Sequence, residues 1–271
     1  MTVLTAPLFG PAPHRPRPTA TRPGRLVGVA SGKGGVGKTC LAIALAHALA
    51  RRGRRVLLFD GDLGLANVDI QLGLLPGADL GAVAAGRVGL AEARQTHSEG
   101  GFDIIAGRSG SGALSTLSAN ALELLLEALR ELARGYDFVL LDLGAGLDRA
   151  VRRMTAFADI PLVVVTDEPT SLTDAYAVLK LLHADAPDAA PRVVVNQASS
   201  QAAGEKTFAT IARACQTFLG QAPVLAGVVR RDEKMRETIR RQALLTTRHP
   251  NCPAAADIAT LAATLDAITP G

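Results

Sequence analysis

The chain has 271 residues, of which 48% are apolar and 3% aromatic, and its formal net charge is +4. It is long enough for one large α/β domain or two small ones, with a core of alanine, leucine and valine. No apolar stretch reaches the ~18 residues that a membrane-spanning helix needs, and three cysteines without paired spacing argue against a disulfide framework, so we expect a cytoplasmic protein.

The positive charge gathers at the start of the chain. Residues 1–59 contain ten Lys or Arg and no Asp or Glu, whereas the remainder contains 19 basic and 25 acidic residues. Residues 1–25, with six prolines and four arginines, predict a disordered tail, and residues 26–271 predict one folded domain. Two interpretations stay open for Arg51–Arg55: binding of nucleic acid or acidic lipid, or complementation of a helix C-terminus.

Residues 31–39 read Ser-Gly-Lys-Gly-Gly-Val-Gly-Lys-Thr and fit the phosphate-binding pattern G-x-x-x-x-G-K-[ST]. Leu26–Ala30 before them predicts a buried strand, and Thr39–Ala50 after them predicts a helix. The glycines let backbone N–H groups approach an anion, and the N-terminus of the helix adds partial positive charge. Lys33 and Lys38 are two of only five lysines in the chain, which favours two ammonium groups close to a phosphate.

Short apolar strands and helical segments alternate over the rest of the chain. The further predicted strands are Arg55–Asp60, Phe102–Ala106, Phe138–Asp142, Leu162–Thr166, Arg192–Asn196 and Val224–Val229. The clearest predicted helices are Ala119–Ala133, Ser171–His183, Glu205–Leu219 and Asp257–Ile268. Unbroken Val and Leu runs are typical of parallel strands covered on both faces. We therefore predict an α/β fold: a single doubly wound, mostly parallel sheet with helices on both faces.

Polar residues stand where several of these strands are predicted to end. Asp60, Asp142 and Asn196 each end a strand, and Asp62 follows closely after Asp60. Ligands of such folds bind at the carboxyl ends of the strands, so these side chains should meet the phosphate loop. Asp142 with Thr39 would suit Mg²⁺, Asp60 is a further candidate, and Asp62 would orient an attacking water. The alternative for each aspartate is a cap or turn residue.

The loop with its early lysine, Lys33, resembles the deviant Walker A loop of the MinD/ParA P-loop ATPases. Within that family the chain is most similar to the flagellar-number regulators called FlhG, FleN or YlxH. The narrower match is carried by residues 62–69, 142–146 and 168–176, which read Asp-Leu-Gly-Leu-Ala-Asn-Val-Asp, Asp-Leu-Gly-Ala-Gly and Glu-Pro-Thr-Ser-Leu-Thr-Asp-Ala-Tyr. Residues 195–198, Val-Asn-Gln-Ala, add a weaker match, and the resemblance runs over roughly residues 25–268.

This resemblance implies a slow, Mg²⁺-dependent ATPase that forms a homodimer on binding ATP. Lys33 would reach the phosphates of the partner subunit, Lys38 would hold the β- and γ-phosphates, and Asp62 would position water as a third catalytic residue. Thr39 and Asp142 would serve Mg²⁺. The ATP-binding residues implied are Gly32, Lys33, Gly34, Gly35, Val36, Gly37, Lys38, Thr39, Cys40 and Asn196.

Three features depart from the family pattern. Residues 1–25 lack the Asp-Gln-Ala-type motif associated with stimulation of the partner GTPase FlhF. Residues 250–271 contain no Lys or Arg, unlike the basic amphipathic helix with which family members bind membrane, and their apolar stripe is expected to pack on the core. Leu143 replaces the small polar residue usual after the Mg²⁺ aspartate.

The function hypothesis is an ATPase that controls flagellar number or placement, transiently at the membrane or cell pole. Its expected partner is a flagellar transcription activator, an FlhF-type GTPase or a basal-body protein. The alternatives are a division-site or DNA-partition ATPase, an iron–sulfur carrier of related fold, and a scaffold that holds ATP without hydrolysis. Direct DNA binding is not expected, because residues 230–241 contain both basic and acidic side chains. This segment is interpreted as a solvated helix face or, from the resemblance, as a segment near the nucleotide base. Cys215 and Cys252 are a poor pair for a cluster.

Overall fold

A computed structural model describes residues 24–62, 64–74, 77–107 and 117–268. The predicted tail lies outside these residues apart from its last two positions, and strand β1 already begins at Arg25. Among the described residues no helix is both long and apolar enough to cross a bilayer.

In the described part of the chain, eight strands form a single sheet in the order β3-β4-β2-β5-β1-β6-β7-β8. All neighbouring strands run parallel except β3, which pairs antiparallel with β4 at one edge. The strands are β1 (Arg25–Ser31), β2 (Val56–Gly61), β3 (Gln95–His97), β4 (Phe102–Ile105), β5 (Phe138–Ala145), β6 (Ile160–Val165), β7 (Arg192–Ala198) and β8 (Val224–Arg230). The doubly wound, mostly parallel sheet predicted from the Val and Leu runs is confirmed.

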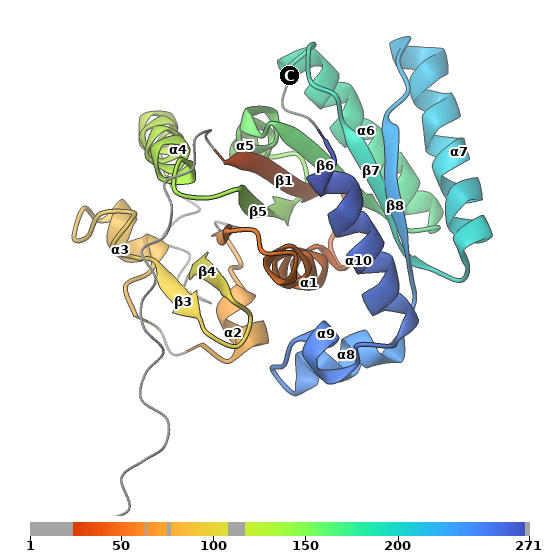
Figure 1. Cartoon of the computed structure of the whole chain (residues 1–271). Helices are drawn as coiled ribbons and strands as arrows, with labels where there is room; N and C mark the ends of the chain where they lie inside the picture. Colours follow the sequence, from red (N-terminus) through yellow and green to blue (C-terminus); the bar gives the residue numbers. More distant parts are fainter. Residues whose placement is uncertain (1–23, 63, 75–76, 108–116, 269–271) are drawn as a thin grey trace, which may run out of the picture.

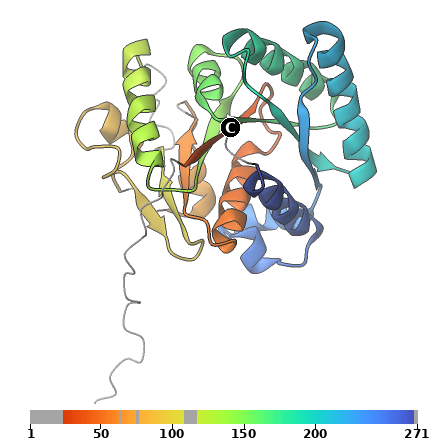
Figure 2. The same cartoon turned by 45° about the horizontal axis from the view of Figure 1, so that its top comes forward.

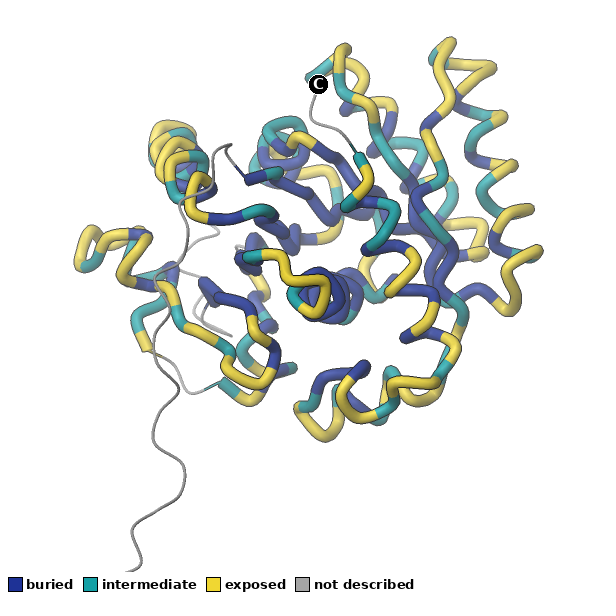
Figure 3. Tube along the Cα trace, in the orientation of Figure 1, coloured by how far each residue is buried: buried dark blue, intermediate teal, exposed yellow. Residues whose placement is uncertain are grey.

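Helices cover both faces of this sheet, as Figures 1 and 2 show. One face carries α1 (Lys38–Arg51), α2 (Val68–Leu72), α8 (Glu233–Arg240), α9 (Leu245–Arg248) and α10 (Pro253–Asp266). The other carries α3 (Leu80–Ala84), α4 (Ala119–Ala133), α5 (Arg149–Phe157), α6 (Pro169–Asp185) and α7 (Gln201–Leu219). The central strands β1, β2, β5, β6 and β7 are mostly buried between these layers. Helices α4 and α7 keep exposed outer faces (Figure 3).

The first helix is the best-covered one. From Leu41 to Leu49 every residue of α1 is buried, because the sheet lies on one side and α10 on the other. The apolar stripe predicted for residues 257–268 packs into this same cluster through Ile258, Leu261 and Leu265, which confirms the expectation that it faces the core. The N-terminus of α1 is thereby fixed against the centre of the sheet.

Two of the predicted strands end more than one residue away from their carboxyl ends in the structure, and the others end one residue away. Strand β5 continues three residues past Asp142 to Ala145, and β7 continues two residues past Asn196 to Ala198. Asp142 is therefore a ladder residue, paired in register with Asp60 on β2. The polar side chains still lie at the carboxyl edge of the sheet, where β1 leads into α1.

Candidate functional site

The loop between β1 and α1 leaves a helix N-terminus open to a ligand. Gly37 caps α1 in the left-handed conformation at φ 90°, and as a glycine it has no side chain that could accept a hydrogen bond from the first turn. Gly35 is also left-handed, at φ 79°. Because the first backbone N–H groups of a helix need acceptors, this end favours an anion such as a phosphate.

Lys38 points into this loop rather than into solvent. Its side chain is buried, and its Nζ donates a hydrogen bond to Ser31 Oγ at 2.9 Å. Burial lowers the pKa of Lys38, and the nearby carboxylates of Asp142 and Asp62 oppose that shift. The ammonium group and the two carboxylates therefore share one site, and the ammonium is in place to meet a phosphate.

Asp142 has the environment of a cation ligand. It is almost fully buried, and its Oδ1 accepts no hydrogen bond from any described residue. Burial raises the pKa of Asp142 to about 7, the Thr39 hydroxyl works against this shift, and nearby Asp60 adds to it. A buried carboxylate oxygen without a donor beside a hydroxyl fits a hard cation such as Mg²⁺, which takes oxygen ligands.

Asp60 is equally buried but is engaged by the backbone. Its Oδ1 accepts a hydrogen bond from the N–H of Asp62 at 3.3 Å, and its Oδ2 accepts from Asn67 and Val68 at 3.2 Å each. Burial raises the pKa of Asp60, and these three N–H donors lower it in part. The geometry therefore gives Asp60 the turn role that was open for each aspartate: it shapes the loop that leads from β2 into α2.

Asp62 lies between that loop and the end of β5. Its Oδ1 accepts hydrogen bonds from Gly64 and Leu65 at 3.3 and 2.9 Å. A Cβ placed on Gly144 would stand 3.3 Å from the same oxygen, so the two loops touch. Asp62 is only half-buried and faces the carboxyl edge of the sheet, where a water molecule can reach it.

Lys33 is the predicted site residue that the structure places apart. Its Nζ contacts the Glu168 carboxylate and donates a hydrogen bond to Thr170 Oγ1 at 2.9 Å, at the start of α6. The hydrogen bond from Lys33 lowers the pKa of Glu168. Within one chain this lysine therefore extends away from the buried Lys38 and remains partly exposed.

A cavity of about 240 Å³ adjoins the loop, and Asp142 is not among the described residues that line it. Gly35, Gly37 and Cys40 form one wall, and residues 229–239 with the end of β7 form the other. Its volume and its mixed lining suit a flat heterocycle attached to a phosphate chain. Several of residues 230–236, for which a place near a nucleotide base was one interpretation, line this cavity.

Two amides at the end of β7 hold the phosphate loop. Asn196 Nδ2 donates a hydrogen bond to the Val36 carbonyl at 2.7 Å, and Gln197 Nε2 donates to the Gly35 carbonyl at 3.3 Å. Gln197 adopts φ 58°, an unfavourable conformation for a residue with a side chain. Sequence reasoning assigned a role to Asn196 but none to Gln197, although the Val-Asn-Gln-Ala match contains both, because no sequence pattern reported the backbone conformation of Gln197.

Cys40 lines the same cavity but is not a reactive thiol. Its Sγ donates to Gln71 Oε1 at 3.3 Å, and burial raises its pKa to about 11. Cys215 and Cys252 lie on α7 and before α10. No group of three Cys, His, Asp or Glu suited to a metal occurs among the described residues.

The arginines of residues 51–55 are engaged within the fold. Arg52 and Arg54 form ion pairs with Asp266 at 3.0 and 2.8 Å, and Arg55 pairs with Asp137 at 3.0 Å. Asp266 is the last residue of α10, so the two ion pairs of Arg52 and Arg54 hold that helix against the turn after α1. The structure thus gives three of these arginines a structural role.

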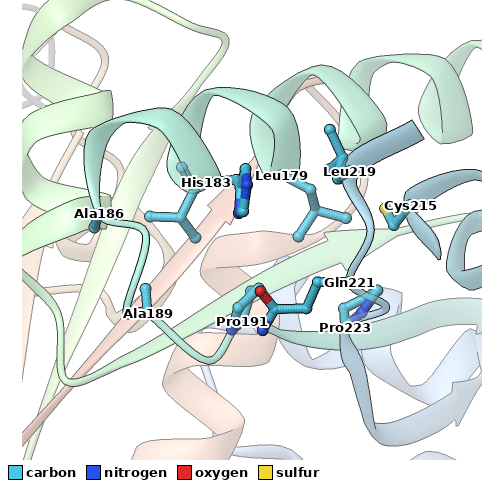
Figure 4. Close-up of a pocket in the computed structure, with 10 residues that line it drawn as sticks. Leu179, His183, Ala186, Ala189, Pro191, Cys215, Leu219, Gln221 and Pro223 are labelled. Carbon is cyan, nitrogen blue, oxygen red and sulfur yellow. The ribbon is translucent and has the colours of Figure 1, made fainter. Parts of the chain in front are cut away.

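A second hollow, between α6 and α7, lies at the wrong end of the strands for the loop. Pro191 and Pro223, which precede β7 and β8, form its floor, and Leu179 and Cys215 form its sides (Figure 4). Its volume of about 20 Å³ is close to that of a single water. It is therefore too small for a nucleotide.

These features can be compared with known proteins. The family model for the CobQ/CobB/MinD/ParA nucleotide binding domain matches residues 27–245. The chain belongs to this family. The family model thus confirms the nucleotide-binding family predicted from the loop.

Relatives of this MinD/ParA-family chain include flagellar proteins. The chain is 40% identical to the antiactivator FleN of Pseudomonas aeruginosa over 220 residues, which are 81% of this chain and 78% of FleN. It is 33% identical to the flagellum site-determining protein YlxH of Helicobacter pylori over 158 residues, 58% of this chain and 53% of YlxH. Both relatives belong to the flagellar branch that residues 62–69 and 168–176 indicate.

The fold also matches a solved structure with a bound nucleotide. The septum site-determining protein MinD complexed with Mg-ADP from Pyrococcus horikoshii superposes with a TM-score of 0.76 at 25% identity. The match covers 90% of this chain and 96% of that one. The single sheet and both helical layers are therefore those of the MinD/ParA fold.

Proposed function

We infer that this protein is an ATP-switched regulator of flagellar number or placement, which acts as a homodimer and hydrolyses ATP slowly. The observation that carries the proposal is the deviant loop: it has one inward lysine, Lys38, and one outward lysine, Lys33. The 40% identity to FleN, an antiactivator, supports the flagellar assignment. FleN is similar over most of its own length, so the likeness is not confined to the loop.

In this proposal the loop holds the triphosphate of ATP. The backbone N–H groups of residues 32–38 and the N-terminus of α1 meet its oxygens, and the Lys38 ammonium balances the β- and γ-phosphate charge. Thr39 and Asp142 would hold Mg²⁺, whose charge would stabilise the phosphates as the terminal bond breaks. Asp62 would orient the attacking water from the neighbouring loop.

The adenine ring would occupy the cavity beside the loop. The side-chain nitrogen of Asn196 donates a hydrogen bond to the Val36 carbonyl. The side-chain oxygen of Asn196 would then accept a hydrogen bond from the amino group of adenine. Residues 229–239 would cover the ring from the other side.

Lys33 would complete the site of a second subunit. Because Lys33 extends outward to Glu168 and Thr170, it would not contact the phosphates bound by its own chain. It would instead be available at the surface that a second subunit would approach. ATP would then favour the dimer because both subunits contact it, and hydrolysis would remove that preference. We assign the ATP-bound dimer to the cytoplasm, with a flagellar transcription activator, an FlhF-type GTPase or a basal-body protein as its partner.

A division-site role is the second candidate, because the superposed MinD is a septum site-determining protein. Deleting the gene in its host separates the two roles. We expect cells with changed flagellar number or placement, restored by the native chain and not by Lys38→Ala. Normal flagella together with misplaced septa or lost plasmids would contradict the flagellar role and favour the second candidate.

A further inference from the structure

A third hollow lies far along the chain from the nucleotide site, between α3 with the turn after it and one face of α4. Its volume is about 250 Å³. Leu80 and Leu90 form its floor, Val88 one wall and Leu125 the other. Every described residue that lines it is Gly, Ala, Val or Leu, so this lining offers no polar side chain to a ligand. We call it the α3–α4 groove.

Helix α4 explains why the groove is apolar, because the helix has two leucine-rich faces. Leu122, Leu126 and Leu129 are buried against the sheet. A second face, about 100° around the helix, lines the groove with Leu124 and Leu125. A helix that covers a sheet needs only one apolar stripe. On the second leucine-rich face of α4, Leu124 has 59% of its surface exposed. Such a face marks a surface that something else covers.

The start of the described chain lies next to this helix. The N–H of Gly24 donates a hydrogen bond to the carbonyl of Ala133 at 2.9 Å, so residues 1–23 lead away from the C-terminal end of α4. From Ala133 to the far end of the groove at Leu117 is roughly 24 Å along the helix axis. Residues 10–23, if extended, would span up to about 45 Å and reach every part of the groove.

The composition of residues 1–23 fits this geometry. Their bulky apolar side chains, Val3, Leu4, Leu8 and Phe9, all precede residue 10, and residues 10–23 contain five prolines and three arginines. A proline-rich tether is stiff and loses little entropy when its end binds. Glu127, exposed on the solvent side of α4, complements the arginines, and Glu131 one turn further on already forms an ion pair with Arg134.

We propose that residues 1–9 of this chain dock into the α3–α4 groove, with Leu8 and Phe9 against Leu124 and Leu125. This inference does not depend on ATP binding or on the flagellar role. The contact covers an apolar surface that would otherwise face water. It also divides the predicted tail into an apolar head and a basic tether.

Disulfide trapping in the full-length chain tests the docking. Phe9→Cys is combined with Leu124→Cys in the groove or, as a matched control, with Arg134→Cys, which is exposed and closer to Gly24. After mild oxidation of dilute protein, peptide mapping distinguishes the new disulfide from those of the three native cysteines. We expect the 9–124 bond to form at least tenfold faster than the 9–134 bond. Equal rates would overturn the proposal.

Two further arms identify the occupant. Leu8→Asp added to the 9–124 pair should slow the trapping about tenfold, and an unchanged rate would contradict apolar docking. Mixing chains of normal and heavy isotope composition distinguishes docking within one chain from docking between two copies. In an equal mixture, pairing between copies would place about half of the disulfides between a light and a heavy chain, and that result would overturn the proposal in favour of a second copy.

Discussion

The glycines of the phosphate loop serve different physical needs. A Cβ on Gly32 would stand 2.4 Å from the Asp174 carbonyl oxygen of α6, whereas a Cβ on Gly35 meets nothing within 4 Å. Gly35 needs only its left-handed φ of 79°, while Gly32 lets two backbone segments touch. The two positions therefore predict different costs of substitution.

We expect Gly35→Ala to reduce the free energy of unfolding by about 1 kcal/mol, through backbone strain alone. Gly32→Ala should reduce it by roughly 3 kcal/mol, because α6 and the loop must move apart. Urea unfolding of both variants measures the difference. A larger loss for Gly35→Ala than for Gly32→Ala would contradict this account of the loop.

The two buried aspartates make a second prediction at this scale. Asp142 offers an oxygen without a donor, whereas both oxygens of Asp60 accept backbone N–H groups. Calorimetry of ADP binding with and without Mg²⁺ should show at least tenfold strengthening by Mg²⁺ in the native chain and in Asp60→Asn, and none in Asp142→Asn. If Asp60→Asn alone removes the Mg²⁺ effect, the assignment of these residues is reversed.

Much of the candidate site was predictable residue by residue. Lys38, Asp62 and Asp142 were predicted to meet at the carboxyl edge, and both carboxylates lie near enough to Lys38 to oppose the lowering of its pKa by burial. The contact between Lys33 and Glu168 was not predicted, because the two residues are 135 positions apart and no local pattern relates them. The different roles of Asp60 and Asp142 were not predictable from their positions at predicted strand ends, because both are carboxylates there. Only their hydrogen bonds in the structure distinguish them.

At the scale of elements, long apolar segments were predictable and short polar ones were not. Helix α4 has the predicted bounds, Ala119–Ala133, because its leucines recur at helical spacing. The segments missed include β3, with three residues, and α5, which carries three arginines. Helix α5 is fixed by an Asp148 cap and by Met154 in the core rather than by its own composition. Tertiary contacts therefore determine the secondary structure of these segments.

His47 gives a prediction for the packing of α1 against α9. Its Nδ1 lies 2.6 Å from the Thr246 hydroxyl, and burial, with help from Arg51, lowers its pKa to about 4. An unfolded chain protonates this histidine near pH 6.5, so between pH 6.5 and 4 only the unfolded state gains the proton. The contribution of His47 to stability is thus present above pH 6.5 and lost as the pH falls to 4.

We expect His47→Gln to flatten the stability profile across that window. The native chain should lose roughly 2–3 kcal/mol more than the variant between pH 6.5 and 4. Urea unfolding at several pH values measures this, and the difference at pH 8, where the imidazole is neutral in both states, isolates the packing change. Parallel profiles for the two proteins would show that His47 is not buried as described.

For the whole molecule, the division of work between Lys33 and Lys38 predicts two kinds of defect. Lys38→Ala should abolish nucleotide binding, because the buried ammonium faces the phosphates of its own chain. Lys33→Ala should keep nucleotide binding within about threefold and lower phosphate release at least 100-fold, because its partner phosphates lie in the second subunit. Fluorescent-nucleotide titration and a phosphate-release assay separate the two, and equal binding losses would contradict the division.

The most direct measurement is the mass of the particle that each nucleotide produces. Mass photometry of Asp62→Ala, which should bind ATP without hydrolysing it, is predicted to show dimers with ATP and Mg²⁺ and single chains with ADP. The added variant Lys33→Ala should return the ATP sample to single chains. Two results would contradict the claim that two copies of this loop close on ATP: Asp62→Ala remains a single chain with every nucleotide, or it forms dimers whether or not nucleotide is present.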